Sequence, residues 1–524
     1  MLSDPTSGHS LNKKFSNHQL TEMNQLKAGA ALNYVVILLN IAVGLLYTPY
    51  MLRMMGQSEY GLYSLVASVI AYLTVLDLGL GNAVVRYTAK YRAEGKTKEQ
   101  YEMFGMFLIL YSIISIVALA GGIGLYLNVD TMFGDTMSET ELSKARIMML
   151  ILVFNLAFTF PMSIFGSIMS AYERFIFPKV INIIRVILNT AIMIALLEMG
   201  YKAVAMVILQ TVFNVATLVI NFLYCKYKLQ IKIQFARFQW GFLREVAIYS
   251  FWIFLNVIMD KIYWSTGQFI LGIVSGTVAI AIFAVAIQLQ SMYMHFSTAI
   301  SSVFLPKVTG MVALRNDKEE ISNLFIRTGR IQNIIMAMIL FGFITFGRSF
   351  IELWAGPDYK EAYIITCLFF ISLYIPLIQN LGITILQARN QMKFRSLLYI
   401  VIAAVALVLQ YYFAKLWGGI GCAIAIAGAL FVGQGIIMNI YYKVKQGINI
   451  GRFWKEIAKM NLAPFILSIG FAYAMHGTII DSWLKLALYI LIYAIIYIAL
   501  LCTVSMNQYE RNLFIDPIRK ILKR

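Results

Sequence analysis

Long apolar runs repeated along the chain limit its fold more than any other feature. A helix that crosses the hydrocarbon core of a bilayer needs about 20 mostly apolar residues. Scanning the 524 residues with that template predicts about fourteen spans. Their approximate limits are 28–52, 60–84, 104–127, 147–170, 179–198, 203–224, 247–272, 278–305, 331–354, 362–388, 396–414, 418–442, 460–478 and 484–505. The sequence therefore predicts an all-α integral membrane protein.

The composition excludes several other classes of protein. Hydrophobic residues make up 60% of the chain and charged residues only 13%, which is typical of a polytopic membrane protein. The net charge of +18 does not indicate nucleic-acid binding, because the basic residues lie in short gaps between apolar runs. The cysteines are isolated, and the sequence lacks phosphate-cradling, zinc-protease and Asp-x-Asp motifs. We therefore expect no metal, no cofactor and no enzymatic activity.

The basic residues also predict an orientation. If both termini are cytoplasmic, the predicted inner segments hold most of the lysines and arginines, in agreement with the positive-inside rule. The outer segments keep only Arg53, Lys144, Arg146, Lys202, Arg348, Lys360, Lys415 and Lys485. The alternation fails if one span is missed or invented, so it supports an even number of spans. We expect a multi-pass protein of a bacterial cytoplasmic (inner) membrane with both ends inside.

A weak internal repeat, shifted by about 220 residues, suggests two related lobes. Residues 56–69 align with 275–289, and residues 91–99 align with 311–319. Each lobe then holds six helices, and the two lobes enclose a central cavity. The predicted parts are a cytoplasmic N-terminal tail (1–27), an N-lobe (28–240), a C-lobe (241–445), and two further helices with a basic tail (446–524).

Two adjacent charges occupy the middle of the predicted span 247–272. Asp260 and Lys261 share one side of that helix with Asn256, whereas the opposite side is apolar. A charge at bilayer depth is costly and therefore indicates a functional site by default. One interpretation is a cationic site in a transport pathway. The other is an ion pair that neutralises itself inside a packed bundle.

Polar residues recur at helical spacing on five other predicted spans. The residues Gln288 and His295 belong to one such stripe, Asn214 to another, and Arg185 to a third. These stripes predict either the lining of a water-filled cavity or hydrogen bonds between packed helices.

Asp77 lies inside the cytoplasmic end of span 60–84. Arg53 and Arg86 lie at span ends, where arginines commonly extend to the interface.

The segment from Gly44 to Lys96 resembles a known family of transporters. The points of likeness are Pro49, Arg53, Gly56, Tyr60-Gly61, Asp77-Leu78-Gly79 and Arg86. They are similar to the polysaccharide flippases, the Wzx-type translocases of O-antigen and capsule units in the multidrug/oligosaccharidyl-lipid/polysaccharide exporter superfamily. The resemblance implies an undecaprenyl-pyrophosphate-linked oligosaccharide as substrate, moved to the outer leaflet by alternating access for surface polysaccharide synthesis. It also implies cooperation with polysaccharide-assembly proteins.

The same resemblance gives roles to the charges inside the spans. Lysine and arginine neutralise a pyrophosphate strongly in a low-dielectric cleft. Lys261, Arg185, Arg53 and Arg86 thereby become candidate ligands of the headgroup. Asp260 and Asp77 become residues that hold those cations or respond to H⁺ or Na⁺. Asn256, His295, Gln288 and Asn214 complete the expected cavity.

Two other functions compete with a flippase. A cation-coupled multidrug exporter of the same superfamily would need an acidic cavity for cationic drugs, whereas Arg185, Lys261 and Asp260 together are net positive. A membrane glycan polymerase or ligase would need a large outer loop that carries catalytic side chains. The longest predicted outer segment, 128–146, is short and acidic. We therefore expect a flippase.

Overall fold

The computed structural model describes residues 6–236, 240–301, 308, 310–311, 317–389, 391–475, 478 and 480–512. Side chains are described from Ala28 onward, except at 29–30, 248–249, 252–253, 256 and 299–300. Every regular element in these ranges is helical. Twelve helices among the described residues are long and apolar enough to cross a membrane, judged by length and composition. The prediction of an all-α membrane protein is confirmed.

The chain divides into two compact units, Met1–Lys261 and Ile262–Arg524, and the division falls inside one helix, α9. The predicted boundary of the lobes at residue 240 and their arrangement around a cavity stay predictions. The elements of the first unit, together with α9, are α1 (Thr6–Met55), α2 (Gln57–Leu73), η1 (Thr74–Asp77), α3 (Leu80–Ala93), α4 (Thr97–Leu127), α5 (Val129–Phe133), α6 (Glu139–Ala171), α7 (Ile176–Glu198), α8 (Ala203–Leu223), η2 (Tyr224–Lys228) and α9 (Trp240–Trp264).

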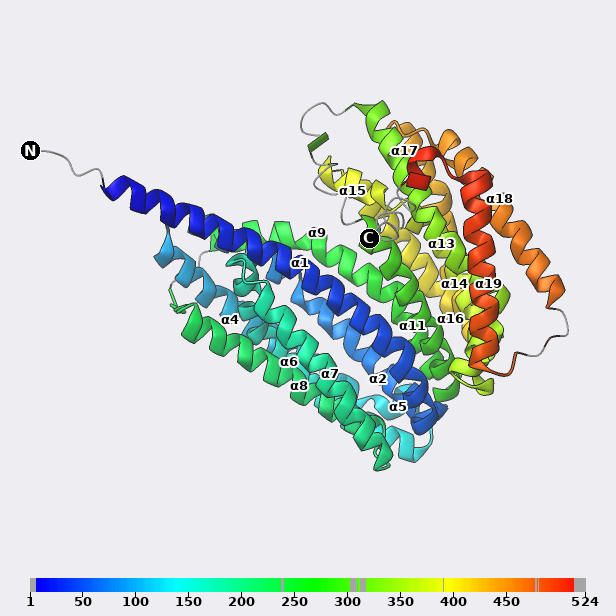
Figure 1. The fold of residues 1–524 in the computed structure, drawn as a ribbon. Coiled ribbons are helices and arrows are strands. Elements are labelled where there is room, and N and C mark those ends of the chain that lie inside the picture. Colours follow the sequence, from blue (N-terminus) through cyan, green and yellow to red (C-terminus); the bar gives the residue numbers. More distant parts are fainter. Residues whose placement is uncertain are drawn as a thin grey trace, which may run out of the picture. The chain divides into compact units, whose positions relative to one another are not determined.

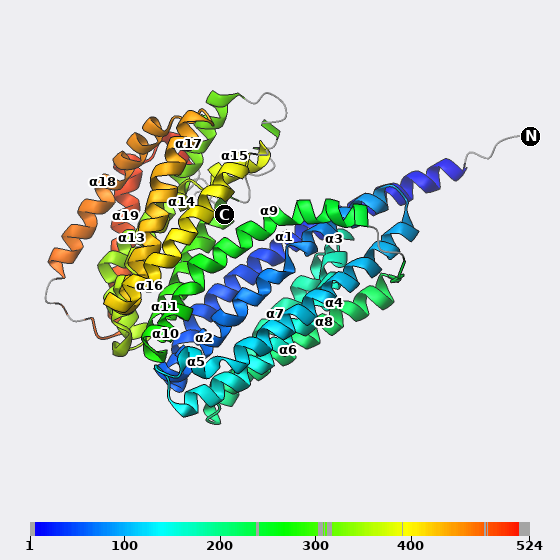
Figure 2. The same ribbon diagram turned by 180° about the vertical axis from the view of Figure 1, so that it is seen from behind.

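Helix α6 is the centre of the first unit. It packs against α2, α3, α4 and α8, while α1 packs along α7 (Figures 1 and 2). A capping box fixes where α6 begins: the Ser138 hydroxyl accepts a hydrogen bond from the Glu141 N–H (3.4 Å), and the Glu141 carboxylate accepts one from the Ser138 N–H (2.9 Å). The buried face of α6 includes Met148, Leu152 and Phe160.

The second unit is also entirely helical in its described part. Its elements are α10 (Thr266–Val274), α11 (Thr277–Ser301), α13 (Lys318–Trp354), η4 (Pro357–Tyr359), α14 (Glu361–Ile378), α15 (Leu381–Ala388), α16 (Lys393–Leu430), η5 (Phe431–Ile437), α17 (Met438–Val444), α18 (Ile450–Ala474), α19 (Trp483–Leu500) and η6 (Leu501–Ser505). Helix α14 packs against α11, α13 and α16, and α13 also packs against α18.

Two places in the chain account for the difference between the predicted fourteen spans and the twelve candidates. The run Lys393–Val444 is 52 residues long, which at 1.5 Å per residue is about 78 Å, more than twice the hydrocarbon core. It folds back at Trp417 and Gly418, whose backbone is not helical, and so contains the predicted spans 396–414 and 418–442. The predicted span 247–272 is divided at Ser265 into α9 and α10 and is not among the twelve candidates. The count of fourteen is therefore not confirmed.

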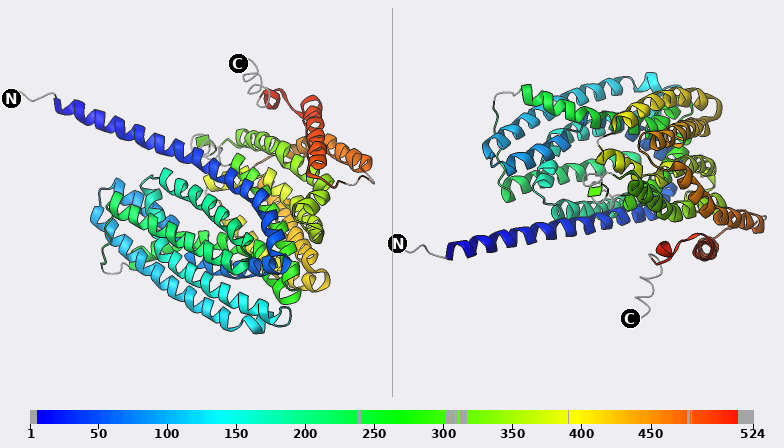
Figure 3. Two further views of the ribbon diagram at one scale, coloured as in Figure 1. Left: turned by 60° about the horizontal axis from the view of Figure 1, so that its bottom comes forward. Right: turned by 90° about the horizontal axis from the view of Figure 1, so that it is seen from above.

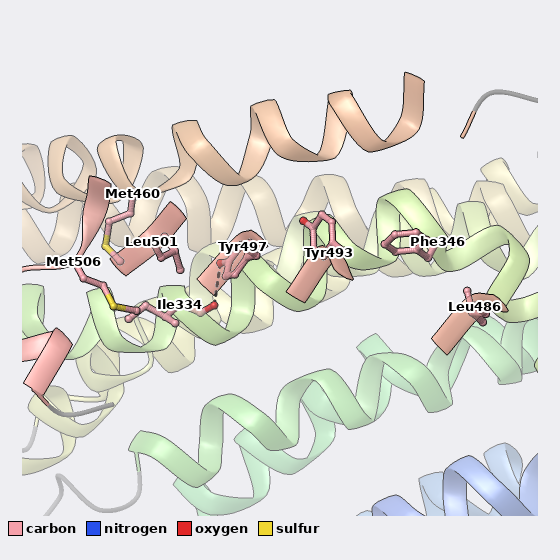
Figure 4. Packing of buried hydrophobic residues seen from close by; sticks show 8 residues of the cluster. All are labelled: Ile334, Phe346, Met460, Leu486, Tyr493, Tyr497, Leu501 and Met506. Carbon is pink, nitrogen blue, oxygen red and sulfur yellow. Dashed lines mark hydrogen bonds between the residues drawn. The ribbon is translucent and has the colours of Figure 1, made fainter. Parts of the chain in front are cut away.

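The C-terminal helices of the second unit pack on α13 through a compact apolar cluster. Helices α18 and α19 are the orange and red helices in Figure 3. Tyr493 and Tyr497 of α19 point toward α13, where the Tyr497 hydroxyl donates a hydrogen bond to the carbonyl oxygen of Ile334 (2.9 Å; Figure 4). The Tyr493 hydroxyl lies 2.9 Å from that of Ser468 on α18. The cluster is formed by Ile334, Phe346, Met460, Leu486, Tyr493, Tyr497, Leu501 and Met506.

Candidate functional site

The first candidate feature is a break in the long helical run Gln57–Ala93. After η1 the backbone turns through Leu78 (φ 53°) and Gly79 (φ 71°), both in the left-handed region, and α3 then begins. Glycine adopts this conformation readily, whereas leucine adopts it at a cost of about 1–2 kcal/mol. Non-helical backbone at membrane depth occurs where it is buried in protein or lines a water-filled cavity. The break places the Asp77 carboxylate at the junction of two half-helices.

Polar side chains from two other helices surround Asp77. The Tyr111 hydroxyl of α4 lies beside the carboxylate, and Ser163 of α6 lies next to the same hydroxyl. Tyr111 is fully buried, and within the described chain its hydroxyl has no hydrogen-bond partner of good geometry. A Cβ atom added at Gly81 would lie 3.1 Å from the Ser167 Oγ, so α3 approaches α6 closely here. Asp77 therefore shares a half-buried polar site with hydroxyls that sequence spacing did not associate with it.

A second feature is the polar seam between α1 and α7. At one end the Lys179 Nζ donates to the Asn33 Oδ1 (2.7 Å), and at the other the Tyr50 hydroxyl donates to the Glu198 carboxylate. Arg185 lies between these bonds along α7 and is half-buried. No carboxylate partner of Arg185 is present among the described residues.

Other polar atoms in the α1–α7 region are also unsatisfied. The Asn189 Oδ1 and the Tyr47 hydroxyl are buried and have no hydrogen-bond partner in the described chain. An unpaired buried polar atom costs about 1–3 kcal/mol, which a bound water or ligand would recover. Arg185, Asn189 and Tyr47 thus have hydrogen-bonding capacity that the described part of the chain does not fully use.

The charges in the middle of the predicted span 247–272 lie at the end of α9. Asp260 is exposed and Lys261 is half-buried, four residues before the interruption at Ser265. Successive residues on a helix point about 100° apart, so these two side chains do not face each other. The Asn256 side chain lies outside the described residues. A helix interrupted beside a charge is a common way to build an ion or substrate site in transporters.

Two predicted polar stripes are largely used in packing between helices. On α8, the Asn214 Nδ2 donates to the Asn155 Oδ1 (2.7 Å) and Thr159 Oγ1 (2.8 Å) of α6, while Gln210 and Tyr63 exchange hydrogen bonds. In the second unit, the Asn380 Nδ2 donates to the hydroxyls of Ser297 (3.3 Å) and Ser301 (2.9 Å) on α11. For Asn214 and Asn380 the packing interpretation accounts for the amide nitrogens.

The remaining predicted residues have more accessible positions. His295 is exposed on α11, and Gln288 is half-buried on the same helix. Arg53 is exposed at the end of α1, and Arg86 is exposed on α3 with its guanidinium 5.7 Å from the ring centre of Tyr87. The structure brings Asp77 together with hydroxyl groups, and among the described residues it gives Arg185 no carboxylate partner. It does not assemble all ten predicted residues into one described site.

A buried ionic cluster in the second unit was not predicted. The Arg330 guanidinium donates from Nε to the Glu510 Oε1 (2.6 Å) and from Nη2 to the Glu510 Oε2 (2.8 Å). Its Nη1 donates to the Glu456 Oε2 (2.6 Å). The partners are 126 and 180 residues from Arg330, so no local spacing could have indicated them. The cluster joins α13, α18 and the residues after η6.

Comparison with known proteins identifies related sequences and folds. Residues 26–312 match the family described as "Polysaccharide biosynthesis protein". The uncharacterized membrane protein EpsK of Bacillus subtilis (strain 168) is 21% identical over 511 residues, which cover 93% of this chain and 97% of EpsK. The family match covers more than half of the chain.

Two solved structures share the fold. The lipid II flippase MurJ in an inward closed conformation has a TM-score of 0.68 and 17% identity, covering 94% of this chain and 99% of MurJ. An inward-facing multidrug resistance MATE family transporter of the MOP superfamily has a TM-score of 0.58 and 16% identity, covering 79% of this chain and 99% of the transporter. Likeness at these identities establishes the fold and leaves the substrate open.

Proposed function

The chain belongs to the polysaccharide biosynthesis protein family, and from that premise we propose that it is a flippase for a lipid-linked oligosaccharide. Its family and its structural neighbours are transporters and flippases and not catalysts. The proposed substrate is an undecaprenyl-pyrophosphate-linked oligosaccharide unit for O-antigen, capsule or a similar surface polysaccharide. It moves from the cytoplasmic to the outer leaflet of the bacterial cytoplasmic membrane by alternating access, with both termini cytoplasmic.

The observation that most supports an anionic substrate is that Arg185 has no carboxylate partner among the described residues. The Arg185 guanidinium is half-buried and has no carboxylate partner in the described chain, so it can form charge-assisted hydrogen bonds to an external anion. A pyrophosphate supplies that charge, and the buried Asn189 and Tyr47 oxygens, on α7 and α1, can accept hydrogen bonds from water or sugar hydroxyls. Lys261, Arg53 and Arg86 are proposed as further headgroup ligands.

We assign coupling to the helix break at Asp77. A carboxylate beside buried hydroxyls can release or bind a proton, or contribute to a Na⁺ site, as the half-helices move. Asp260 is the second proposed coupling residue, and Asn256, Gln288, His295 and Asn214 are proposed to line the pathway. Within the described part of the chain, no three His, Cys, Asp or Glu residues are grouped to hold a metal ion.

A cation-coupled multidrug exporter is the alternative function, and it is favoured by the fold shared with the MATE transporter. A cavity for lipophilic cations should be acidic, because acidic side chains attract a cationic substrate and basic side chains repel it. The proposed ligands Arg185 and Lys261 with Asp260 are net positive. That balance supports an anionic substrate over a cationic drug.

Binding of the purified protein to a labelled undecaprenyl-pyrophosphate oligosaccharide tests the proposal. Arg185→Gln should weaken binding by about tenfold or more, because a charge-assisted hydrogen bond contributes about 1.5–3 kcal/mol. The matched control is Arg348→Gln, because Arg348 is exposed and already paired with Glu352. Equal affinities of the wild type and Arg185→Gln, or equal losses of affinity in Arg185→Gln and Arg348→Gln, would show that Arg185 does not bind the substrate.

A further inference from the structure

A pocket of about 560 Å³ lies at one end of the first unit. It is formed where α2 and α6 begin and where the turn from α7 to α8 passes. Its volume falls within the range of about 300–1,000 Å³ that ligand sites occupy. Its apolar lining comprises Leu196, Val204, Ala205, Ile208, Leu209 and Val212. The five lining residues of α8 span about 12 Å along the helix axis, from the first turn toward its middle.

The mouth of this pocket is polar and carries a net positive charge. It contains Glu59, Lys144 and Lys202. The Lys144 ammonium forms an ion pair with the Glu59 carboxylate, which also accepts a hydrogen bond from the Ala203 N–H (3.4 Å). Lys202 is exposed and, among the described residues, forms no ion pair. One cation is therefore neutralised and the other is available to an anion.

The surroundings of the pocket are those of a lipid-facing surface. Helices α7 and α8 lie in two of the candidate membrane spans, and few residues in the most apolar part of either span are buried. Ile208 and Val212, which line the pocket, are 46% and 58% exposed. In a membrane, such exposed apolar residues contact acyl chains. Lysines are rare in the segments predicted to face outward, yet two of them meet at this mouth.

We propose that this pocket binds one anionic glycerophospholipid of the outer leaflet. The lipid phosphate contacts Lys202 and the Lys144–Glu59 pair, and one acyl chain lies along α8 against Leu196 and Val212. The complementarity is of two kinds: a cationic mouth faces an anionic headgroup, and an apolar groove runs into the bilayer from that mouth. This inference is independent of the transported substrate, because the bound lipid is a component of the membrane that supports the α7–α8 turn.

Native mass spectrometry of the delipidated full-length protein tests the proposal directly. Dioleoyl phosphatidylglycerol and dioleoyl phosphatidylcholine are added in separate titrations, so that the acyl chains are identical and one headgroup is anionic while the other has no net charge. The wild type should bind phosphatidylglycerol about fivefold more tightly, the value expected for one lysine at an anionic lipid surface. Lys202→Gln should abolish most of that preference. Lys360→Gln is the matched control, because Lys360 is another exposed lysine outside the pocket.

Ala205→Phe tests the apolar half of the site, because the larger side chain fills the groove. It should reduce retention of both lipids, and Val212→Trp at the other end of the groove provides a second test if the first variant does not fold. A phosphatidylglycerol preference that survives in Lys202→Gln, or that Lys360→Gln loses equally, would overturn the proposal. Displacement of phosphatidylglycerol by equimolar undecaprenyl phosphate would also overturn it and assign the pocket to the isoprenoid carrier.

Discussion

Removing the Glu510 carboxylate should destabilise the second unit strongly. The Glu510 side chain is fully buried, and the Arg330 side chain is only 8% exposed. In Glu510→Ala, the guanidinium loses two charge-assisted hydrogen bonds and, of its contacts with the described residues, keeps those to Glu456 and to the Ser505 carbonyl oxygen. The substitution also removes the carboxylate that accepts the Asn507 N–H (3.0 Å).

The expected magnitude follows from burial. Removing one partner of a buried ion pair costs about 3–5 kcal/mol, and because the Glu456 contact remains we expect a loss of about 3 kcal/mol here. Glu456→Ala should cost only about 1 kcal/mol, because Glu456 is 31% exposed and solvent screens its interaction. For a unit of this size, about 3 kcal/mol corresponds to a fall of about 6 °C in Tm.

Thermal unfolding in detergent, followed by size-exclusion chromatography at one heating rate, measures these differences. Asp481→Asn is the control, since Asp481 and Lys485 form an exposed pair, and its Tm should equal that of the wild type. Arg330→Met combined with Glu510→Leu should recover part of the lost stability, because apolar residues often replace a buried ion pair well. Equal Tm values for Glu510→Ala and Asp481→Asn would refute the reasoning.

Three further predictions concern the sites and the fold. Arg185→Lys should recover part of the substrate affinity that Arg185→Gln loses, as measured by labelled-substrate binding, whereas a purely steric role would make both variants equal. Asp77→Asn should remove the pH or Na⁺ dependence of transport in proteoliposomes, while the exposed control Asp135→Asn keeps it; an unchanged dependence would exclude Asp77 from coupling. Gly421→Ala should lower the free energy of unfolding by about 1–3 kcal/mol, because the new Cβ would lie 2.0 Å from the Phe413 carbonyl oxygen. Gly428→Ala is the control, because its Cβ would meet open space and the substitution should be neutral or stabilising. Equal Tm values for the two variants would contradict this close approach of the backbone.

The sequence predicted the helical class and most spans because hydropathy reports directly on lipid-facing length. It did not predict the breaks. The span 60–84 contains a turn through Leu78 and Gly79, and the span 247–272 is interrupted at Ser265. Glycine at position 79 is compatible with a left-handed turn, but leucine at position 78 gives no such signal. Apolar content is similar on both sides of a break, so hydropathy cannot locate it.

The polar stripes show a different limit of sequence reasoning. Helical spacing places residues on one face but does not say what that face contacts. Asn214 meets Asn155 and Thr159 on another helix, whereas Arg185 meets no carboxylate in the described chain. Both residues have the same kind of spacing in the sequence. Only the positions of neighbouring helices distinguish a packing contact from an unsatisfied site.

Ionic contacts between residues far apart in the sequence were the least predictable feature of the fold. Arg330 lies just before the predicted span 331–354, in a segment predicted to be cytoplasmic, although its guanidinium is buried against Glu510. Residue 510 lies after the last predicted span, where an acidic residue usually remains solvated. The contact depends on how α13, α18 and the residues after η6 pack, and that packing involves apolar residues spread over the second unit.

Leaflet translocation in proteoliposomes tests the central proposal most directly. A labelled undecaprenyl-pyrophosphate oligosaccharide is placed in one leaflet, and its appearance in the other is followed for the wild type, Lys261→Ala and Arg348→Ala. Efflux of a lipophilic cationic dye is measured on the same vesicles. The account predicts that the wild type and Arg348→Ala move the lipid-linked sugar, that Lys261→Ala does not, and that the dye is retained. Dye efflux without movement of the sugar would contradict the account and identify a drug exporter.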